Sequence, residues 1–299
     1  MRAPRFWFAP PAPAPLVARL LTPLGALYGA ATARRLARAR PCRAGVPVIC
    51  VGNLTAGGAG KTPAAIALAA RLREGGRTVH VVLRGHGGRA AGPLAVVPGR
   101  HGAALVGDEA LLHAAFGPTI IARDRAAGVA AAEAAGAAAV ILDDGHQNAS
   151  VAKDLSIVVV DAARGFGNHR CIPAGPLREP VAAGLARADM LLVVGRAAAR
   201  AAFRAGLGAL SCPVIEGELV ALHTGIEWRG RRLVAFAGIG DPARFFTTLR
   251  ELGAELVHAE ALDDHAKLAP GLLRRLAGMA RAAGADLVTT EKDAARLPP

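Results

Sequence analysis

Residues 46–63 read Val-Pro-Val-Ile-Cys-Val-Gly-Asn-Leu-Thr-Ala-Gly-Gly-Ala-Gly-Lys-Thr-Pro. The apolar run 46–51 is typical of a buried strand, and the Ala- and Leu-rich segment after it is typical of a helix. A glycine-rich turn joins the two. Without Cβ atoms, successive backbone N–H groups of such a turn can approach phosphate oxygens at the positive helix end. The stretch therefore predicts a nucleoside triphosphate cradle formed by Thr55, Ala56, Gly57, Gly58, Ala59, Gly60, Lys61 and Thr62.

Lys61 and Thr62 end the turn and have defined tasks in loops of this kind. The lysine pairs with the β- and γ-phosphates, and the hydroxyl binds Mg²⁺. The common pattern G-x-x-x-x-G-K-[ST] has glycine where Thr55 stands, whereas Gly60, Lys61 and Thr62 match it. The alternative is a chance glycine-rich turn that carries a lysine. The strand–turn–helix context favours the triphosphate.

Composition narrows the range of partners. The chain has 299 residues, enough for one large or two ordinary domains, and a formal net charge of +13. This excess suits an anionic membrane surface or a phosphorylated substrate. Nucleic acid is not expected as a partner, because the arginines are scattered, aromatic residues make up only 4%, and no nucleic-acid-binding signature is found. No obligate protein partner is inferred. The four cysteines lack C-x-x-C spacing, which fits a reducing cytosolic setting.

The N-terminal region, residues 1–40, contains a charge-free stretch of 14 residues from Leu20 to Ala33. The stretch is too short to span a bilayer, and export is not expected because a nucleotide-dependent enzyme follows it. On a helical wheel one arc collects the large apolar residues Leu16, Val17, Leu20, Leu21, Leu24, Leu27 and Tyr28. Thr22 and Pro23 could cap and restart the helix. Aromatic residues precede the helix and arginines follow it, as in helices that lie in a membrane interface. The alternative, that this arc packs against the domain itself, is equally compatible.

Strands alternate with helical segments along the rest of the chain, which predicts an α/β fold with a doubly wound, mainly parallel sheet. The expected strands are 78–83, 118–122, 138–142, 155–160 and 190–194, and the expected helices are 61–74 and 124–135. A long Gly- and Pro-rich loop, 164–180, is expected to carry binding work. The pattern predicts a core domain at 41–212, a connection at 213–234 with extended pieces at 214–222 and 231–236, and a smaller αβ domain at 235–299.

Several polar residues could carry phosphoryl-transfer chemistry. Asp143 and Asp144 end a buried strand in the manner of a Walker B carboxylate that meets Mg²⁺. Asp108 and Glu109 open a helix, and local sequence alone favours a capping role for them. Transfer to an alcohol needs a carboxylate to deprotonate the hydroxyl and cations to stabilise the moving charge. Two cationic candidates are Arg178 and His265.

A set of motifs in a fixed order resembles one family over nearly the whole chain. The motifs are residues 52–63, Gly107-Asp108-Glu109, Asp143-Asp144-Gly145-x-Gln147, Gly167-Asn168, residues 173–180 (Pro-Ala-Gly-Pro-Leu-Arg-Glu-Pro), Asp264-His265 and residues 289–293 (Thr-Thr-Glu-Lys-Asp). They resemble the tetraacyldisaccharide 4'-kinases, which phosphorylate the lipid A precursor. The resemblance implies a P-loop NTPase-like fold of two αβ domains joined by a β-ribbon, with the acceptor bound between them. It implies a peripheral enzyme at the cytoplasmic face of the bacterial inner membrane.

The same resemblance implies residue roles. Asp108 would be the base that activates the acceptor hydroxyl, and His265 would pair with it. Lys61, Thr62, Glu109, Asp143 and Asp144 would hold ATP and Mg²⁺, Gln147 would contribute to nucleotide binding, and Arg178 would steady phosphate charge. The chain departs from the family pattern at His86, His146 and Asn148, where tyrosine, phenylalanine and histidine are usual.

Two other function classes are compatible with the cradle or the charge. A membrane-associated regulatory P-loop ATPase or GTPase also uses a Gly-Lys-Thr turn, although a guanine-specific Asn-Lys-x-Asp motif is missing. A basic nucleic-acid-binding protein would show steeply salt-dependent binding to duplexes.

Overall fold

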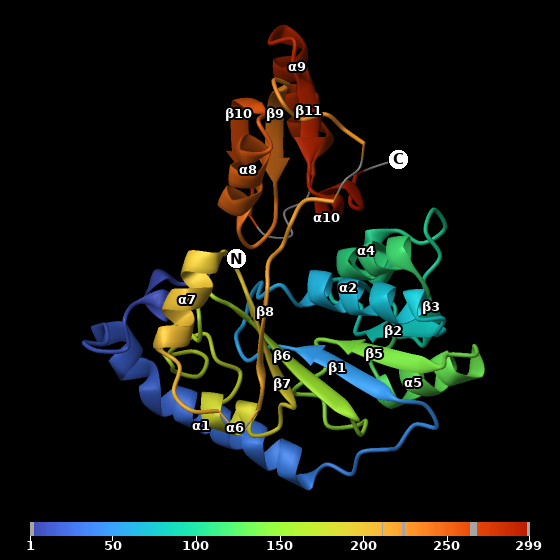
Figure 1. The fold of residues 1–299 in the computed structure, drawn as a ribbon, viewed down its shortest axis with the longest axis vertical. Helices are drawn as coiled ribbons and strands as arrows, with labels where there is room; N and C mark the ends of the chain where they lie inside the picture. The colour runs from blue at the N-terminus through green and yellow to red at the C-terminus, as the bar shows by residue number, and fades with distance from the viewer. Residues whose placement is uncertain (1–2, 211, 223–224, 264–267, 298–299) are drawn as a thin grey trace. The chain divides into compact units, whose positions relative to one another are not determined.

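Parallel strand pairing organises the computed structural model, which describes residues 3–210, 212–222, 225–263 and 268–297 (Figure 1). The chain divides into two compact units, Ala3–Leu219 and Val220–Pro299. The first unit contains an eight-stranded sheet in the order β3-β4-β2-β5-β1-β6-β7-β8, and the second a three-stranded sheet in the order β10-β9-β11. The predicted α/β class with a mainly parallel sheet and a second, smaller αβ unit is confirmed.

In the first unit every strand pair is parallel except β3 with β4. The strands are β1 (Val48–Gly52), β2 (Val79–Leu83), β3 (Leu94–Ala95), β4 (Thr119–Ile121), β5 (Ala139–Asp143), β6 (Leu155–Asp161), β7 (Met190–Val194) and β8 (Val214–Gly217). All residues of β2, β4 and β5 are buried, as expected of parallel strands covered on both faces. This burial explains why the strands read as continuous apolar runs.

Helices cover both faces of this sheet. They are η1 (Arg5–Phe8), α1 (Leu16–Arg38), α2 (Lys61–Glu74), α3 (Ala103–Val106), α4 (Asp108–Phe116), α5 (Arg125–Ala134), α6 (Val181–Leu185) and α7 (Ala197–Ala205). Ala65 and Ala69 of α2 pack with Ala110 of α4 on one face of the central strands. Val129 and Ala132 of α5 pack on the opposite face. Figure 1 shows α5 on the other side of the sheet from α2 and α4. The sheet is thus doubly wound, as predicted.

The second unit repeats this layering on a smaller scale. Its elements are β9 (Arg232–Ala237), α8 (Pro242–Glu251), β10 (Glu255–Ala261), α9 (Pro270–Ala282), β11 (Asp286–Thr289) and α10 (Glu291–Ala294). Strand β9 lies between its two parallel neighbours. Phe246 of α8 packs on one face of β9 and Leu276 of α9 on the other.

The two extended pieces expected to connect the domains belong to different sheets. Strand β8 pairs with β7 at the edge of the large sheet, and β9 is the central strand of the small one. The predicted boundaries at 212 and 235 stay predictions.

Helix α1 packs on the domain through a different face from the apolar arc that its sequence singled out. Its buried positions are the small residues Ala18, Gly25, Gly29 and Thr32, and a Cβ on Gly25 would lie 2.6 Å from the backbone oxygen of Cys171. The large apolar arc faces outward, with Leu20 70% and Leu27 67% exposed. The helix therefore packs on the loop 164–180 through small residues and leaves most of its large apolar side chains exposed.

Two details of α1 differ from expectation. The helix runs through Pro23 without restarting, and the Thr22 hydroxyl donates a hydrogen bond to the Ala18 carbonyl one turn earlier. With 23 residues, α1 is also long and apolar enough to cross a bilayer by length and composition. The apolar stretch predicted from the sequence is shorter than the helix, because only the charge-free residues were counted. The helix itself continues into the arginines at its C-terminal end.

Candidate functional site

The cradle lies between β1, which is central in the large sheet, and the first turn of α2. Gly60 caps α2 with a positive φ of 84°, and Gly57 has a φ of 109°, so both adopt backbone conformations that favour glycine. A Cβ added to Gly57 or Gly58 would meet no atom within 4 Å. This side of the turn is therefore open, as a phosphate-binding loop requires.

The cradle is held from behind by its own asparagine and by the loop 164–180. The buried Asn53 amide donates to the Thr55 carbonyl at 2.7 Å. Backbone N–H groups of Ala56 and Arg178 donate to the carbonyls of Pro176 and Leu54, at 2.7 and 2.8 Å. The predicted binding loop thus supports the cradle through main-chain bonds.

Three charged residues meet beside the cradle. Asp144 Oδ1 lies 3.7 Å from Lys61 Nζ and 2.7 Å from Arg178 Nη1. Burial, the largest single influence, acts to raise the pKa of the Asp144 carboxyl, but the charges of Lys61 and Arg178 together outweigh it and hold that pKa below its ordinary value. Asp144 also has a positive φ of 55°, uncommon for a residue with a Cβ. The structure brings together three residues that the sequence singled out separately.

Asp143 and Thr62 form the part of the site that suits a magnesium ion. Thr62 Oγ1 lies 3.3 Å from Asp143 Oδ2, and the carboxylate is 2% exposed. Within the described part of the chain, Asp143 Oδ1 is buried without a hydrogen-bond partner. An orphaned carboxylate oxygen next to a hydroxyl fits Mg²⁺, which prefers oxygen ligands and takes one or two carboxylates together with phosphate oxygens and waters. The described residues contain no cluster of three or more His, Cys, Asp or Glu side chains that could hold a metal without such additional ligands.

Asp108 and Glu109 begin α4, as predicted, and Asp108 Oδ1 accepts a hydrogen bond from the Glu109 N–H. The expected capping role is wrong, because the N-cap of α4 is Gly107 and no side chain caps the helix, whereas both carboxylates lie in the first turn, as expected. Asp108 is nevertheless only 4% exposed, and α4 packs against α2. One turn along α4, His113 Nε2 lies 2.8 Å from Asp143 Oδ2. Because residues four apart share a helix face, Glu109 lies on the side of α4 that faces Asp143.

Gln147 is hydrogen-bonded to Asn53, which precedes the cradle segment. Its Nε2 donates to the Asn53 carbonyl and to Glu179 Oε1, both at 2.9 Å. Glu179 is buried and forms an ion pair with Arg187 at 2.7 Å. His265, the remaining predicted catalytic residue, lies outside the described residues.

Three residues at the site were not singled out in the sequence. His113 contacts Asp143, Glu179 anchors Gln147, and the buried Arg125 contributes positive charge that helps to lower the pKa of Asp144. The spacing Glu109-x-x-x-His113 on one helix face was the available signal for His113. Arg125 directly follows the N-cap Asp124, where an exposed arginine is the ordinary expectation.

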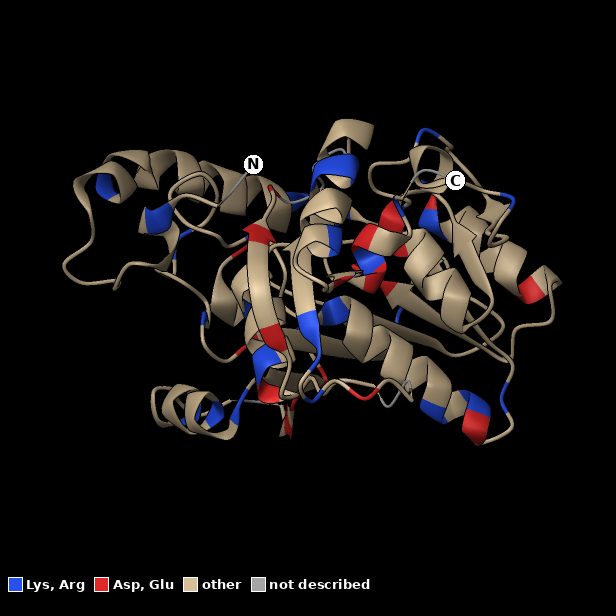
Figure 2. Ribbon diagram, turned by 90° about the horizontal axis from the view of Figure 1, so that it is seen from above, with Lys and Arg blue, Asp and Glu red and all other residues tan. Residues whose placement is uncertain are grey.

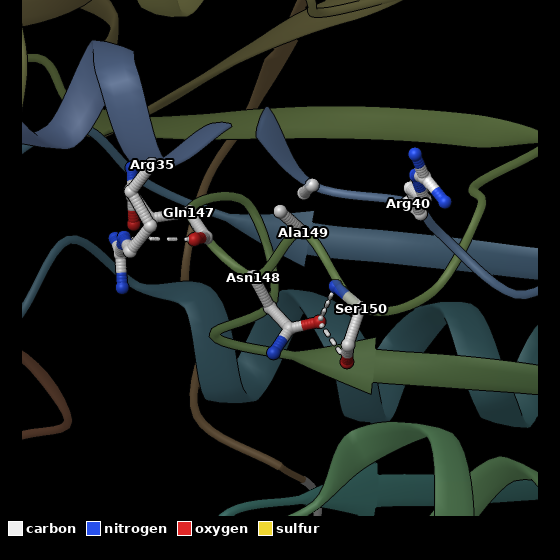
Figure 3. Close-up of a pocket in the computed structure, with 7 residues that line it drawn as sticks. Arg35, Arg40, Gln147, Asn148, Ala149 and Ser150 are labelled. Atoms are coloured by element: carbon white, nitrogen blue, oxygen red, sulfur yellow. Dashed lines mark hydrogen bonds between the residues drawn. The ribbon is translucent and has the colours of Figure 1, made fainter. Parts of the chain in front are cut away.

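A separate surface pocket of about 370 Å³ lies where α1 ends (Figure 3). Arg35 and Arg40 stand on two sides of it, and residues 147–150 complete the lining. Arg35 Nη2 donates to the Gln147 carbonyl at 3.4 Å. The pocket is thus lined by the basic end of α1 and by the segment that supports the cradle.

Comparison with known proteins identifies the family. The sequence model described as tetraacyldisaccharide-1-P 4'-kinase matches residues 17–299. The chain belongs to this family. A tetraacyldisaccharide 4'-kinase from Dinoroseobacter shibae is 61% identical, over 100% of this chain and 89% of the relative. One from a Jannaschia species is 55% identical, over 100% and 90%.

A solved structure supports the fold of this tetraacyldisaccharide-1-P 4'-kinase family member. It is described as the "apo" form of LpxK from Aquifex aeolicus in complex with ATP, and it aligns with a TM-score of 0.75 and 25% identity. The alignment covers 94% of this chain and 90% of that one. The resemblance stated from the motifs and the P-loop NTPase-like fold class are confirmed. As a member of a kinase family, the chain is a phosphotransferase.

Proposed function

We propose that this chain is an ATP-dependent kinase that transfers the γ-phosphoryl group to the 4'-hydroxyl of an acylated glucosamine disaccharide 1-phosphate in lipid A biosynthesis. The observation that carries the proposal is the convergence of Lys61, Arg178 and Asp144 beside an open, glycine-lined cradle on a P-loop fold. Family membership over nearly the whole chain supports the lipid acceptor.

The cradle residues are proposed to hold the triphosphate of ATP. Backbone N–H groups of residues 55–60 bind phosphate oxygens, and Lys61 neutralises charge on the β- and γ-phosphates. Arg178 stabilises charge that develops on the transferring group. Gln147 contributes through the cradle backbone, because its amide is bonded to the Asn53 carbonyl.

Thr62 and Asp143 are the proposed magnesium ligands, and Glu109 and Asp144 are proposed to support the ion from a second layer. Asp144 fits this supporting role because its carboxylate already forms ion pairs with Lys61 and Arg178. When bound, Mg²⁺ neutralises the charge that builds on the β- and γ-phosphate oxygens during transfer.

Asp108 is the proposed general base. It accepts the proton of the acceptor hydroxyl while the hydroxyl oxygen forms a bond to the γ-phosphorus and the bond to the β,γ-bridging oxygen breaks, which releases ADP. His265 is proposed to pair with this carboxylate and tune it.

The exposed apolar arc of α1 and the arginines at its end support peripheral contact with the cytoplasmic face of the inner membrane. Large apolar side chains beside basic residues are typical of helices that lie in an anionic interface. Nucleic acid is not proposed as a partner, because Lys and Arg are spread over many elements (Figure 2). A flat salt titration of duplex binding would agree with this.

A kinase assay with radiolabelled ATP and the monophosphorylated acyl-disaccharide tests the proposal. We expect wild type to form the bisphosphorylated lipid and Lys61→Ala to fail. Asp108→Ala should lose about 10²-fold or more in kcat while it retains ATP binding, because it lacks only the proton acceptor. Unchanged turnover of Asp108→Ala would refute its assignment as base. ATP hydrolysis by wild type without phosphorylated lipid would favour the regulatory ATPase instead.

A further inference from the structure

We propose that His113 is a positioning residue for the magnesium-binding carboxylate of Asp143, a role that rests on the MgATP half of the proposed function. Its Nε2 lies 2.8 Å from Asp143 Oδ2, and both side chains are at most 2% exposed. An ionised carboxylate only accepts hydrogen bonds, so the histidine nitrogen donates.

The two carboxylate oxygens of Asp143 have different surroundings. Oδ2 accepts from His113 and lies 3.3 Å from the Thr62 hydroxyl, whereas Oδ1 has no partner within the described residues. A carboxylate fixed through one oxygen cannot rotate freely about its terminal torsion. Oδ1 thereby stays free of protein hydrogen bonds and available to a cation, and the fixed orientation of the carboxylate lowers the entropy lost when the metal binds.

The other ring nitrogen of His113, Nδ1, is buried and makes no hydrogen bond within the described chain. A histidine that served only the core would be expected to satisfy both nitrogens or to be replaced by an apolar side chain at no loss. Here the single hydrogen bond that orients the imidazole is the one to Asp143.

The position of His113 on α4 links this contact to the proposed base. The helix begins at Asp108 and Glu109 and reaches Asp143 at the end of β5 through His113. One hydrogen bond therefore fixes the metal ligand and, through the helix, the segment that carries the acceptor-activating carboxylate.

Three variants of the full-length protein test the proposal. His113→Leu removes the donor, and His113→Gln keeps an amide donor at the same number of bonds from Cβ as Nε2. His80→Leu is the matched control, because His80 is also buried with an unpartnered Nδ1 but lies in β2. The main readout is Mn²⁺ affinity, measured by electron paramagnetic resonance with a non-hydrolysable ATP analogue present. Affinity for the analogue in EDTA is measured in parallel.

We expect Mn²⁺ to bind His113→Leu about 10- to 100-fold more weakly than wild type, the range typical of lost outer-shell contacts. His113→Gln should recover most of this loss, His80→Leu should bind Mn²⁺ like wild type, and all four proteins should bind the analogue equally in EDTA. The kcat of lipid phosphorylation should fall in the same order.

Unchanged Mn²⁺ affinity of His113→Leu would overturn the proposal, and so would a His113→Gln protein as weak as His113→Leu. If His113→Leu does not fold, His113→Asn replaces it. The Asn donor is one bond shorter, so Mn²⁺ affinity equal to that of His113→Gln would contradict the positioning role. A wild type that binds Mn²⁺ and analogue but phosphorylates no lipid would reject the proposed acceptor and leave the His113 result standing, because metal binding is measured without lipid.

Discussion

A methyl group added at Gly58 should affect phosphate binding without affecting the fold. A Cβ there would meet no protein atom within 4 Å, and Gly58 does not have the positive φ of Gly57. We expect Gly58→Ala to fold as well as wild type, or to gain roughly 0.4–1 kcal/mol from a less flexible unfolded chain. Its ATP affinity should fall roughly tenfold, because the methyl group occupies space open to phosphate.

Isothermal titration with ATP and a thermal melt measure the two effects of Gly58→Ala separately. Gly208→Ala is the control, since a Cβ at this loop glycine also meets open space away from the cradle. Equal ATP affinities of the two variants would show that the open side of the turn is not where phosphate binds.

His146 should make the free energy of unfolding depend on pH, whereas the phenylalanine that is usual in the family would not. Burial lowers the pKa of His146 to about 4, and its Nε2 donates to the Gly184 carbonyl. In the unfolded chain the pKa returns to about 6.5, so the unfolded state binds more protons between pH 6.5 and 4. Stability contributed by the neutral imidazole is therefore complete above about pH 6.5 and is lost as the pH falls towards 4, by about 3 kcal/mol at most.

Urea denaturation of wild type and His146→Phe at pH 7 and pH 5 tests this. The stability of the variant should fall less between the two pH values, whatever its absolute stability. Parallel losses in both proteins would mean that other groups cause the acid sensitivity.

Residue types and spacing predicted the cradle and the paired aspartates, because a glycine turn before Lys61 and a carboxylate at a strand end are local signals. The spacing of four residues could place His113 on the helix face of Glu109 but could not show its contact with Asp143, and Arg125 had no local signal. Each depends on which strand lies next to its helix, and strand order is not written in local periodicity. The meeting of Arg178 with Asp144 likewise needs a loop to fold back over the cradle.

At the scale of elements, helix 61–74 was predicted to the residue, since Gly60 and Gly75 mark its ends. The central strands were predicted within a residue or two from their apolar runs. The extended piece 214–222 contains β8, but its pairing with β7 could not be predicted, because an edge strand of four residues with little burial has no distinctive pattern. For α1, an apolar arc indicates burial without naming what covers it, so only the structure separated its two faces.

Neighbouring residues of α1 can separate packing from membrane contact. Leu24 is exposed, whereas a Cβ on Gly25 would lie 2.6 Å from the Cys171 carbonyl oxygen. We expect Leu24→Ser to bind vesicles roughly tenfold more weakly with an unchanged melting temperature, since it loses about 1.5–3 kcal/mol of apolar burial in lipid. Gly25→Ala should instead lose about 1–3 kcal/mol of stability through overpacking.

Vesicle sedimentation and thermal melts of both α1 variants provide the comparison. A Leu24→Ser protein that melts earlier but sediments normally would show that the arc is covered by protein and not by lipid.

At the scale of the whole first unit, the N-terminal segment is part of the scaffold behind the nucleotide site. Trp7 Nε1 donates to the Pro173 carbonyl at 3.0 Å, and Arg170 Nη1 donates to the Thr22 hydroxyl at 2.6 Å. The same loop, 164–180, bonds to the cradle through Ala56 and Arg178. The helix proposed to contact the membrane and the cradle proposed to bind ATP therefore contact the same loop.

This layer predicts two losses when residues 1–40 are deleted. The truncated protein should no longer sediment with vesicles, because the apolar arc and Arg35 are gone. It should also bind ATP more weakly in detergent, roughly tenfold, because the loop that holds Arg178 and the cradle loses its cover. The full-length Leu20→Ser, Leu24→Ser, Leu27→Ser protein is the control, since it removes only exposed side chains and should retain ATP affinity. A truncated protein that still sediments would place attachment elsewhere, and one with unchanged ATP affinity would show that the loop holds the cradle without the helix.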